Sequence, residues 1–243
     1  MDILIIIYTH TDYKDVMSIA LKRHSKYSSH FEKVVFSNEI NSNYHTILYN
    51  ECEAYSTRLY NCLTKLDSGI EYIILNHDWV ILYDYINKEK IHNITKIMKE
   101  NDIIQVRLWY NGIIPQNTYQ RSTYTNKYIE ENYIYDIPKE GAYQFTVQPT
   151  IWHLETLKLI LLNHLNLEYR TMELEFYNYM LAFRNSFYYD NEQRFTENGF
   201  YKSSIYPHIH ATSSGKWIIS CYLPYSEEMI NEFKIDTSHR GII

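Results

Sequence analysis

The stretch EYIILNHDWVIL, residues 71–82, predicts a strand that is buried on both faces and carries polar residues inside it. Apolar runs flank Asn76, His77 and Asp78 on both sides. A charge is costly in such a strand unless it is paired or bound to a metal. These three residues are therefore either a turn or a site at the end of the strand.

Alternating strands and helices surround this stretch in the first 110 residues. Further strands are predicted at 2–10, 31–39 and 102–112, and helices at 12–27, 44–66 and 84–101. The alternation is typical of an α/β fold with a Rossmann-type, mostly parallel central sheet flanked by helices. Ligands bind such sheets at the carboxyl ends of the strands. Polar residues lie at three of these predicted ends: His10, Asn38-Glu39 and Asn76-His77-Asp78.

The character of the sequence changes after about residue 111. Residues 115–144 are polar and rich in tyrosine, which predicts loops or short antiparallel strands. We expect a strand, a proline turn and a helix over 145–165, then a helix over 170–186 with Thr171 as its N-cap, then late strands and loops. Because no repeat or linker is present, we predict one composite domain, residues 1–243. Its halves are a nucleotide-binding part (1–110) and a mixed carboxyl-terminal part (111–243).

Composition limits the classes of function. The 243 residues carry a net charge of −6 and no dense cluster of Lys and Arg, which argues against a nucleic-acid partner. No window approaches the ~18 apolar residues of a transmembrane segment, and the apolar run Ile3–Ile7 lacks the features of a signal peptide. The three cysteines form no CxxC pattern, which favours a reducing, cytoplasmic location.

Two groups of residues could hold a metal. Asp78 could bind a divalent cation against a diphosphate, because Mg²⁺ and Mn²⁺ prefer oxygen ligands and often take only one or two carboxylates. An Asx turn is the simpler interpretation of Asn76-His77-Asp78. His208 and His210 alternate on a predicted strand and so point to one face, which suits a metal or a phosphate. The simpler interpretation there is a pair of surface histidines.

Two further groups could serve catalysis or phosphate binding. Glu173 and Glu175 lie near a predicted helix start, where either could be a general base. The helix dipole alone also favours glutamate at that place. Arg58 and Arg107 are possible partners for phosphate.

Four segments resemble a GT-A-fold family of small glycosyltransferase-like proteins from bacteria, phages and large DNA viruses. SGIEYIILNHDWVIL (68–82) is similar to the family's strand eYilylqeDfil, which carries a DxD-type metal motif. FTVQPTIWHLETLKLIL (145–161) is similar to ysLQPaIWkkefLlkil, and RTMELEF (170–176) to PWdfE. YPHIHATSSGKW (206–217) is similar to y...i.kGkW. The QPTIW and GKW matches are the most specific of these.

The resemblance implies transfer of a hexosyl or pentosyl group from a nucleoside diphosphate-sugar donor to a hydroxyl of a glycan or glycoconjugate acceptor, with Mn²⁺ or Mg²⁺. It implies a cytoplasmic protein, or one in the host cytoplasm if the source is viral. Asp78 would hold the metal. The carboxyl-terminal half (111–243) would bind the acceptor and supply the late metal ligand, His208 or His210. Glu175 matches the glutamate of PWdfE and would be the base, with Glu173 as the next candidate. The implied donor-site residues are Tyr8, Thr9, His10, Arg58, Asn76 and His77.

The sequence departs from the family pattern at two places. The acidic motif keeps one carboxylate, Asp78, and Met172 replaces the tryptophan of PWdfE. A glycosyltransferase-like protein with weakened catalysis, which binds a glycan or a partner, is therefore the alternative hypothesis. A nucleotidyltransferase is a third hypothesis, but it predicts a basic, glycine-rich loop after the first strand, and YTHTDYKD (8–15) supplies none.

Overall fold

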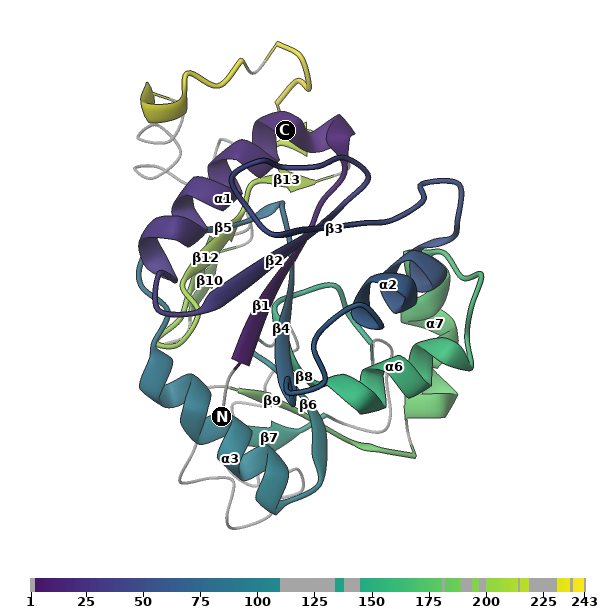
Figure 1. The fold of residues 1–243 in the computed structure, drawn as a ribbon. Coiled ribbons are helices and arrows are strands. Elements are labelled where there is room, and N and C mark those ends of the chain that lie inside the picture. Colours follow the sequence, from purple (N-terminus) through teal and green to yellow (C-terminus); the bar gives the residue numbers. More distant parts are fainter. Residues whose placement is uncertain are drawn as a thin grey trace.

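An eight-stranded sheet forms the centre of the molecule in the computed structural model (Figure 1). The structure describes residues 3–109, 134–137, 145–180, 182–188, 194–196, 200–213, 215–218, 231–236 and 238–242. The strands, in spatial order, are β3 (Thr46–Leu48), β2 (Glu32–Ser37), β1 (Ile3–Tyr8), β4 (Tyr72–His77), β8 (Thr150–His153), β6 (Ile103–Arg107), β9 (Arg184–Tyr188) and β7 (Ile134–Asp136). All pairs are parallel except those made by β8 and β7. The predicted mostly parallel α/β sheet is confirmed.

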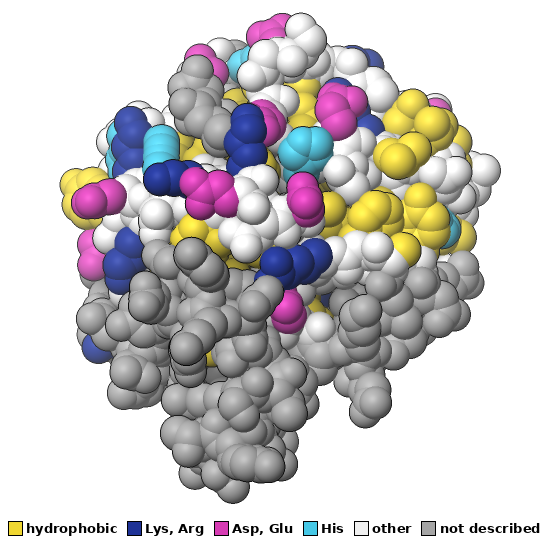
Figure 2. All heavy atoms as spheres, turned by 90° about the horizontal axis from the view of Figure 1, so that it is seen from below, with side chains coloured by type: hydrophobic (Ala, Val, Ile, Leu, Met, Phe, Trp, Pro, Cys, Tyr) yellow, Lys and Arg dark blue, Asp and Glu magenta, His cyan; other side chains and the backbone are white. Residues whose placement is uncertain are grey.

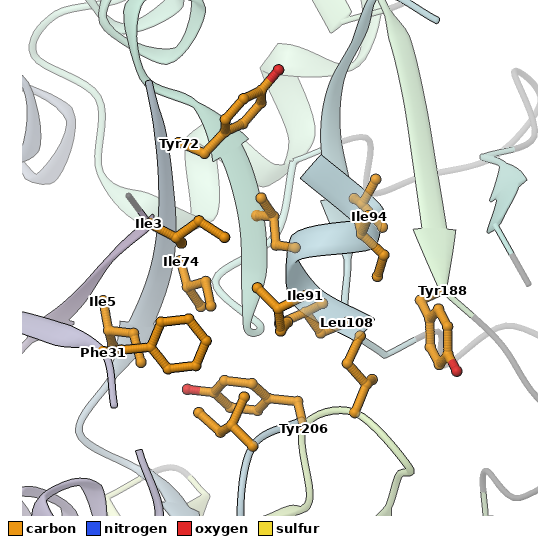
Figure 3. Packing of buried hydrophobic residues seen from close by; sticks show 14 of the residues in the cluster. Ile3, Ile5, Phe31, Tyr72, Ile74, Ile91, Ile94, Leu108, Tyr188 and Tyr206 are labelled. Carbon is orange, nitrogen blue, oxygen red and sulfur yellow. The ribbon is translucent and has the colours of Figure 1, made fainter. Parts of the chain in front are cut away.

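Helices cover both faces of this sheet because its central strands are apolar on both sides. Ile3, Ile5 and Ile7 of β1 pack into a cluster with α1 (Lys14–Tyr27) and α3 (Lys88–Glu100). Figure 3 shows part of this cluster, in which β1 and β4 contribute side chains beside those of α3. Leu4 and Ile6 point to the other face, which α2 (Tyr55–Leu63), α6 (Leu154–Leu162) and α7 (Tyr169–Met180) cover.

The predicted single strand over 71–82 is wrong. It consists of β4 and β5 (Val80–Leu82), and β5 belongs to a second sheet of order β10-β11-β12-β5. The other strands of that sheet are β10 (Arg194–Thr196), β11 (Phe200–Lys202) and β12 (His208–His210). The chain leaves the main sheet at Asp78 and Trp79, and the Trp79 carbonyl accepts a hydrogen bond from the Ala211 N–H at 2.8 Å. The polar residues thus mark the point where the chain changes sheets.

Three other predicted elements differ from the structure. The predicted helix over 44–66 is β3, an edge strand on β2, followed by a turn and the shorter α2. No strand precedes Pro149 within 145–148, and β8 follows the proline instead. The predicted helix over 170–186 ends at Met180, and β9 begins at Arg184. Thr171 lies within the first turn of α7 and is not its N-cap.

The remaining elements lie around the main sheet. The 3-10 helix η1 (Thr11–Tyr13) connects β1 to α1, and β13 (Thr212–Ser213) and β14 (Lys216–Trp217) form a small hairpin after β12. Seen from the amino-terminal ends of β1 and β4, hydrophobic side chains gather on the side of α6, whose Leu159 and Leu162 are about half exposed (Figure 2). Among the described residues, no helix has both the length and the apolar character needed to cross a membrane.

Candidate functional site

The carboxyl ends of β1 and β4 place Thr9 and Asp78 together. These strands pair in parallel with Tyr8 opposite His77, so the following residues leave the sheet at the same edge. The Thr9 hydroxyl donates to Asp78 Oδ2 at 2.5 Å, and the Asp78 N–H donates to the Tyr8 carbonyl at 3.1 Å. The side chain of Asp78 is therefore held in one position at this edge.

The environment of Asp78 brings its titration to neutral pH. The residue is 5% exposed, and burial raises the pKa of its carboxyl group to about 7. The Thr9 hydroxyl, the N–H groups of Trp79 and His10 and the charge of Arg240 act in the opposite direction. A cation bound to the carboxylate would favour the ionised form of Asp78. The position is therefore suited to binding a cation.

His77 lies in a cluster of aromatic rings on the α2 face of the sheet. Tyr8 stacks on Tyr49 with ring centroids 5.1 Å apart and also contacts Tyr55 and His77. The Tyr55 hydroxyl lies 3.0 Å from His77 Nε2. Burial lowers the pKa of His77 to about 3, so the ring is neutral at physiological pH. We define Tyr8, Tyr49, Tyr55 and His77 as the tyrosine cluster.

Arg58 lies beside the tyrosine cluster. Its guanidinium carbon is 5.3 Å from the centroid of the Tyr49 ring, in the range of a cation–π contact. Its Nη2 is 4.0 Å from Glu168, while Nε is buried and makes no hydrogen bond to any residue that the structure describes. A buried guanidinium with unused donors is suited to an anionic ligand.

Asn76 points away from this cluster, to the α1 face of β4. Its side-chain amide donates to His24 Nε2 at 3.0 Å, so the ring proton of His24 is on Nδ1, 3.1 Å from Ser28 Oγ. The Ser28 hydroxyl donates to the His24 carbonyl at 2.7 Å. Burial lowers the pKa of His24 to about 3. In this structure Asn76 connects β4 to α1 and does not contact the tyrosine cluster.

His10 and Asn38, which follow β1 and β2, both contact Glu51. The Nδ1 atom of His10 accepts the Asp12 N–H at 3.1 Å, which caps η1, and its Nε2 lies 3.3 Å from Glu51. The Asn38 amide donates to Thr11 Oγ1 and to Glu51, at 2.9 and 2.8 Å. The polar residues predicted at the ends of β1 and β2 therefore lie close together. His10 and Asn38 form hydrogen bonds and ion pairs mainly with neighbouring side chains at this edge.

β12 carries His208 and His210 to the same region. Its antiparallel register on β5 places His210 opposite Val80 and His208 opposite Leu82, so His210 is the nearer to Asp78 along the chain. The ring of His210 meets Trp79 edge-on at 4.3 Å between centroids. Burial lowers the pKa of both histidines, that of His208 to about 4, so both rings are neutral, which is the metal-binding form.

The described residues do not form a complete metal site by themselves. Within the ranges that the structure describes, no three His, Cys, Asp or Glu side chains gather closely enough to bind an ion. Mg²⁺ and Mn²⁺ commonly complete their coordination with substrate phosphates and water. Asp78 fits a partial site of that kind, and His210 lies beside Trp79, the next residue in the chain.

Glu173 lies near the end of β6 and the tyrosine cluster. The Val147 N–H bonds its carboxylate, and Arg107 and Tyr55 interact with it electrostatically. Burial raises the pKa of Glu173 above its ordinary value, against the opposing effects of the Val147 N–H and Arg107. Such a carboxylate can accept a proton more readily than an exposed one. The side chain of Glu175 lies outside the described part of the chain.

Sequence reasoning missed several residues at this edge. Tyr49 and Tyr55 carry no signal beyond the overall abundance of tyrosine, with 26 in the chain. Arg240 is more than 160 positions from the acidic motif in sequence but lies on the first turn of α1, where it pairs with Asp15. Only the folded arrangement brings these residues to the strand ends.

Comparison with solved structures places the fold among GT-A-type glycosyltransferases. The glycosyltransferase GlyE of Streptococcus pneumoniae matches 98% of this chain and 62% of its own, with a TM-score of 0.53 and 9% identity. S. aureus TarS in complex with UDP-GlcNAc matches 99% of this chain and 69% of its own (TM-score 0.49, 12% identity). A cytidylyltransferase from Leptospira borgpetersenii matches 86% of this chain and 82% of its own (TM-score 0.42, 10% identity). No protein-family model and no curated protein matches the sequence.

The GT-A-type fold that the sequence resemblance implies is therefore present. At these identities the likeness concerns the fold alone, and the chain spans less than two thirds of GlyE. The chemistry has to be argued from the strand-end residues. These supply a fixed carboxylate, neutral imidazoles, a partly buried glutamate and two partly buried guanidinium groups at or near one edge of a sheet.

Proposed function

We propose that this protein is a glycosyltransferase that moves a sugar from a nucleoside diphosphate-sugar to a hydroxyl group of a glycan or glycoconjugate. The observation that carries this proposal is the Asp78 carboxylate. It is buried where β1 and β4 end, is held by Thr9, and lies at the edge of the sheet where α/β folds bind nucleotides. The GT-A-type fold agrees with this use of the edge.

A divalent cation is part of the proposal. Asp78 would hold Mn²⁺ or Mg²⁺ with His210, or with His208 further along β12, and the diphosphate and water would supply the other ligands. When bound, the metal would offset the charge that develops on the leaving diphosphate. Because the protein contributes so few ligands, we expect metal and donor to bind together and the metal alone to bind weakly.

The donor would lie over the end of β1. Tyr8 and Thr9 belong to that strand end, and His10 and Arg58 flank it, which supports these four of the donor contacts that the sequence resemblance implies but not Asn76, which faces α1. The guanidinium of Arg58 is suited to a phosphate oxygen, and neighbouring aromatic rings are suited to a base or sugar. His77 supports this region through Tyr55.

The acceptor hydroxyl needs a base. Glu173 is our first candidate, because its carboxylate is half-buried, bonds the Val147 N–H and has a raised pKa from burial. Glu175 is the residue that matches the family pattern and stays the second candidate. Both lie on α7, so variants at the two positions form a matched pair.

Consumption of the donor tests the proposal. The purified protein is incubated with UDP-glucose, UDP-N-acetylglucosamine and GDP-mannose, with Mn²⁺, Mg²⁺ or chelator, and the released nucleoside diphosphate is measured with and without a mixed glycan acceptor. We expect release from at least one donor that depends on the metal. Asp78→Asn should abolish it, while the exposed Asp84→Asn should leave it unchanged.

The alternative hypothesis predicts a different result. A glycosyltransferase-like protein that only binds a glycan or a partner consumes no donor under any of these conditions. The single carboxylate of the motif favours this alternative, so failure of every donor, in a protein that still unfolds cooperatively, would count for it. Release of pyrophosphate from a nucleoside triphosphate and a sugar phosphate would instead indicate a nucleotidyltransferase.

A further inference from the structure

Arg240 is a buried cation with a defined position beside the candidate site. Its Nε donates to Asp15 Oδ2 at 2.7 Å and its Nη2 to Asp15 Oδ1 at 2.8 Å, a two-point pairing on the first turn of α1. Nη2 also donates to the Asp12 carbonyl, and the guanidinium carbon lies 4.3 Å from the Tyr13 ring centroid. The side chain is only 9% exposed.

The segment that carries Arg240 is fixed to the rest of the molecule. The Gly241 carbonyl accepts the Trp217 N–H at 3.1 Å, and Ile242 forms a bridge with Trp217. Trp217 packs against α1, β5 and β12 in a third apolar cluster. Figure 1 shows this end of the chain lying against α1. The position of Arg240 is therefore set by packing and not only by its ion pair.

This position is next to the Asp78 carboxylate in the fold. The residues that Arg240 contacts, Asp12 and Tyr13, follow Thr9 by three and four positions, and Thr9 is bonded to Asp78. Only the short stretch that leads into η1 therefore separates the contacts of Arg240 from the contact of Asp78.

One side of the guanidinium group remains available to a ligand. Asp15 and Asp12 engage Nε and Nη2, and Nη1 makes no hydrogen bond to any part of the chain that the structure describes. A guanidinium oriented in advance by a carboxylate loses little conformational freedom when it binds a phosphate. In addition to the metal and Arg58, a further fixed cation would help to neutralise a diphosphate.

We propose that Arg240 binds the diphosphate of the donor through Nη1 and that Asp15 positions it for that contact. This inference rests on the proposed function, since it names a further binding residue of the same site. It predicts that the protein distinguishes a diphosphate from a nucleoside through Arg240, in addition to the metal.

Calorimetric titration tests this contact. Inorganic pyrophosphate, UDP, GDP and uridine are titrated into wild type, Arg240→Gln, Arg240→Lys and Asp15→Asn. Loss of a hydrogen bond to a charged group corresponds to about 10- to 100-fold in affinity. We expect Arg240→Gln to weaken diphosphate binding by this amount, Arg240→Lys to weaken it less, and neither to change the binding of uridine.

Asp15→Asn is the matched control, because it breaks the same ion pair from the other end. If Arg240 only anchors its segment, both variants lose that anchor and should affect diphosphate binding equally. If Arg240 contacts the diphosphate and Asp15 only positions it, Asp15→Asn should lose clearly less affinity than Arg240→Gln, because it keeps the cation that makes the contact. Equal affinities for wild type and Arg240→Gln, or equal losses in Arg240→Gln and Asp15→Asn, would overturn the proposal.

Failure of this proposal is distinguishable from failure of the proposed function. Pyrophosphate binding that depends on Arg240, in a protein that consumes no sugar donor, would retain the anion contact and reject the transferase. Donor consumption that is unchanged in Arg240→Gln would retain the transferase and reject the anion contact. A wild-type protein that binds neither pyrophosphate nor any nucleoside diphosphate would reject both.

Discussion

At the scale of single residues, Asp78 and the buried histidines have opposite effects on stability. Burial raises the pKa of Asp78 to about 7, whereas it lowers those of His24 and His77 to about 3 and that of His208 to about 4. The histidines bind fewer protons in the folded state than in the unfolded one, so they stabilise the fold as pH rises towards 6.5. Asp78 binds more protons when folded, so it destabilises the fold as pH rises from about 4 to 7.

Asp78→Asn should therefore stabilise the protein above neutral pH. The buried charge disappears, and the gain is on the order of a few kcal/mol at most. We expect the melting temperature of the variant to exceed that of wild type at pH 8, and the difference to become small as pH falls to 4, where wild-type Asp78 is protonated in the folded state and partly protonated in the unfolded state. Thermal unfolding from pH 4 to 8 measures this difference. A variant that is less stable than wild type at pH 8 would show that the carboxylate is compensated in the fold.

Glu173 gives a second prediction at this scale. Glu173→Gln keeps the shape and a hydrogen-bond acceptor for the Val147 N–H but removes the base. We expect transfer to fall by about 10²- to 10⁴-fold while donor affinity stays within about twofold of wild type. Initial rates and donor titrations are compared for Glu173→Gln and Glu175→Gln. Full transfer by Glu173→Gln together with loss in Glu175→Gln would move the role to Glu175.

At the scale of elements, the two faces of β4 have different contacts. His77 on one face meets the tyrosine cluster, whereas Asn76 on the other bonds His24 of α1. The apolar pattern of 71–82 identifies a buried segment, and the polar residues identify its interruption. The sequence pattern does not reveal that the chain changes sheets at Asp78 and Trp79, because β5 pairs with β12, more than 120 residues later. Similarly, the apolar spacing of 44–66 also fits a helix, but pairing with β2 selects a strand for Thr46–Leu48.

The bond between His24 and Asn76 should contribute to stability as a coupled pair. Each single variant, His24→Leu or Asn76→Leu, leaves one buried polar group without its partner, which costs about 1–3 kcal/mol. The double variant should cost less than the sum of the two, because neither polar group remains. Urea unfolding of the four proteins gives the coupling energy. His45→Leu, at an exposed position, is the control and should change stability by less than about 0.5 kcal/mol. Strict additivity of the two core variants would argue that the bond contributes nothing.

At the scale of the whole molecule, the candidate site is assembled from distant segments. The first strand supplies Thr9, the fourth Asp78, β12 His210, and the last described segment Arg240. Alternating strands and helices in the first 110 residues predict the parallel part of the sheet and the edge where ligands bind. They do not predict the antiparallel β8 between β4 and β6, or the second sheet, because those pairings join residues far apart in sequence.

The contrast between local sequence features and contacts between distant residues also explains how much of the site is predictable. Asp78 can be found from sequence because a carboxylate inside an apolar run is unusual. Arg240 and Tyr55 cannot, because an arginine in a polar segment and a tyrosine in a helix are ordinary until the fold brings them to the strand ends. The sequence thus predicts Asp78 at the centre of the site but not Arg240 or Tyr55.

The central claim is that Asp78 couples a metal ion to the diphosphate of a nucleotide, and one calorimetric measurement tests it most directly. UDP and GDP are titrated into wild type and Asp78→Asn with and without Mn²⁺. We predict that Mn²⁺ increases the affinity of wild type for one of the two by at least about tenfold, or 1.4 kcal/mol, and leaves that of Asp78→Asn unchanged. An equal effect of Mn²⁺ on both proteins, or no nucleotide binding by wild type, would contradict the account.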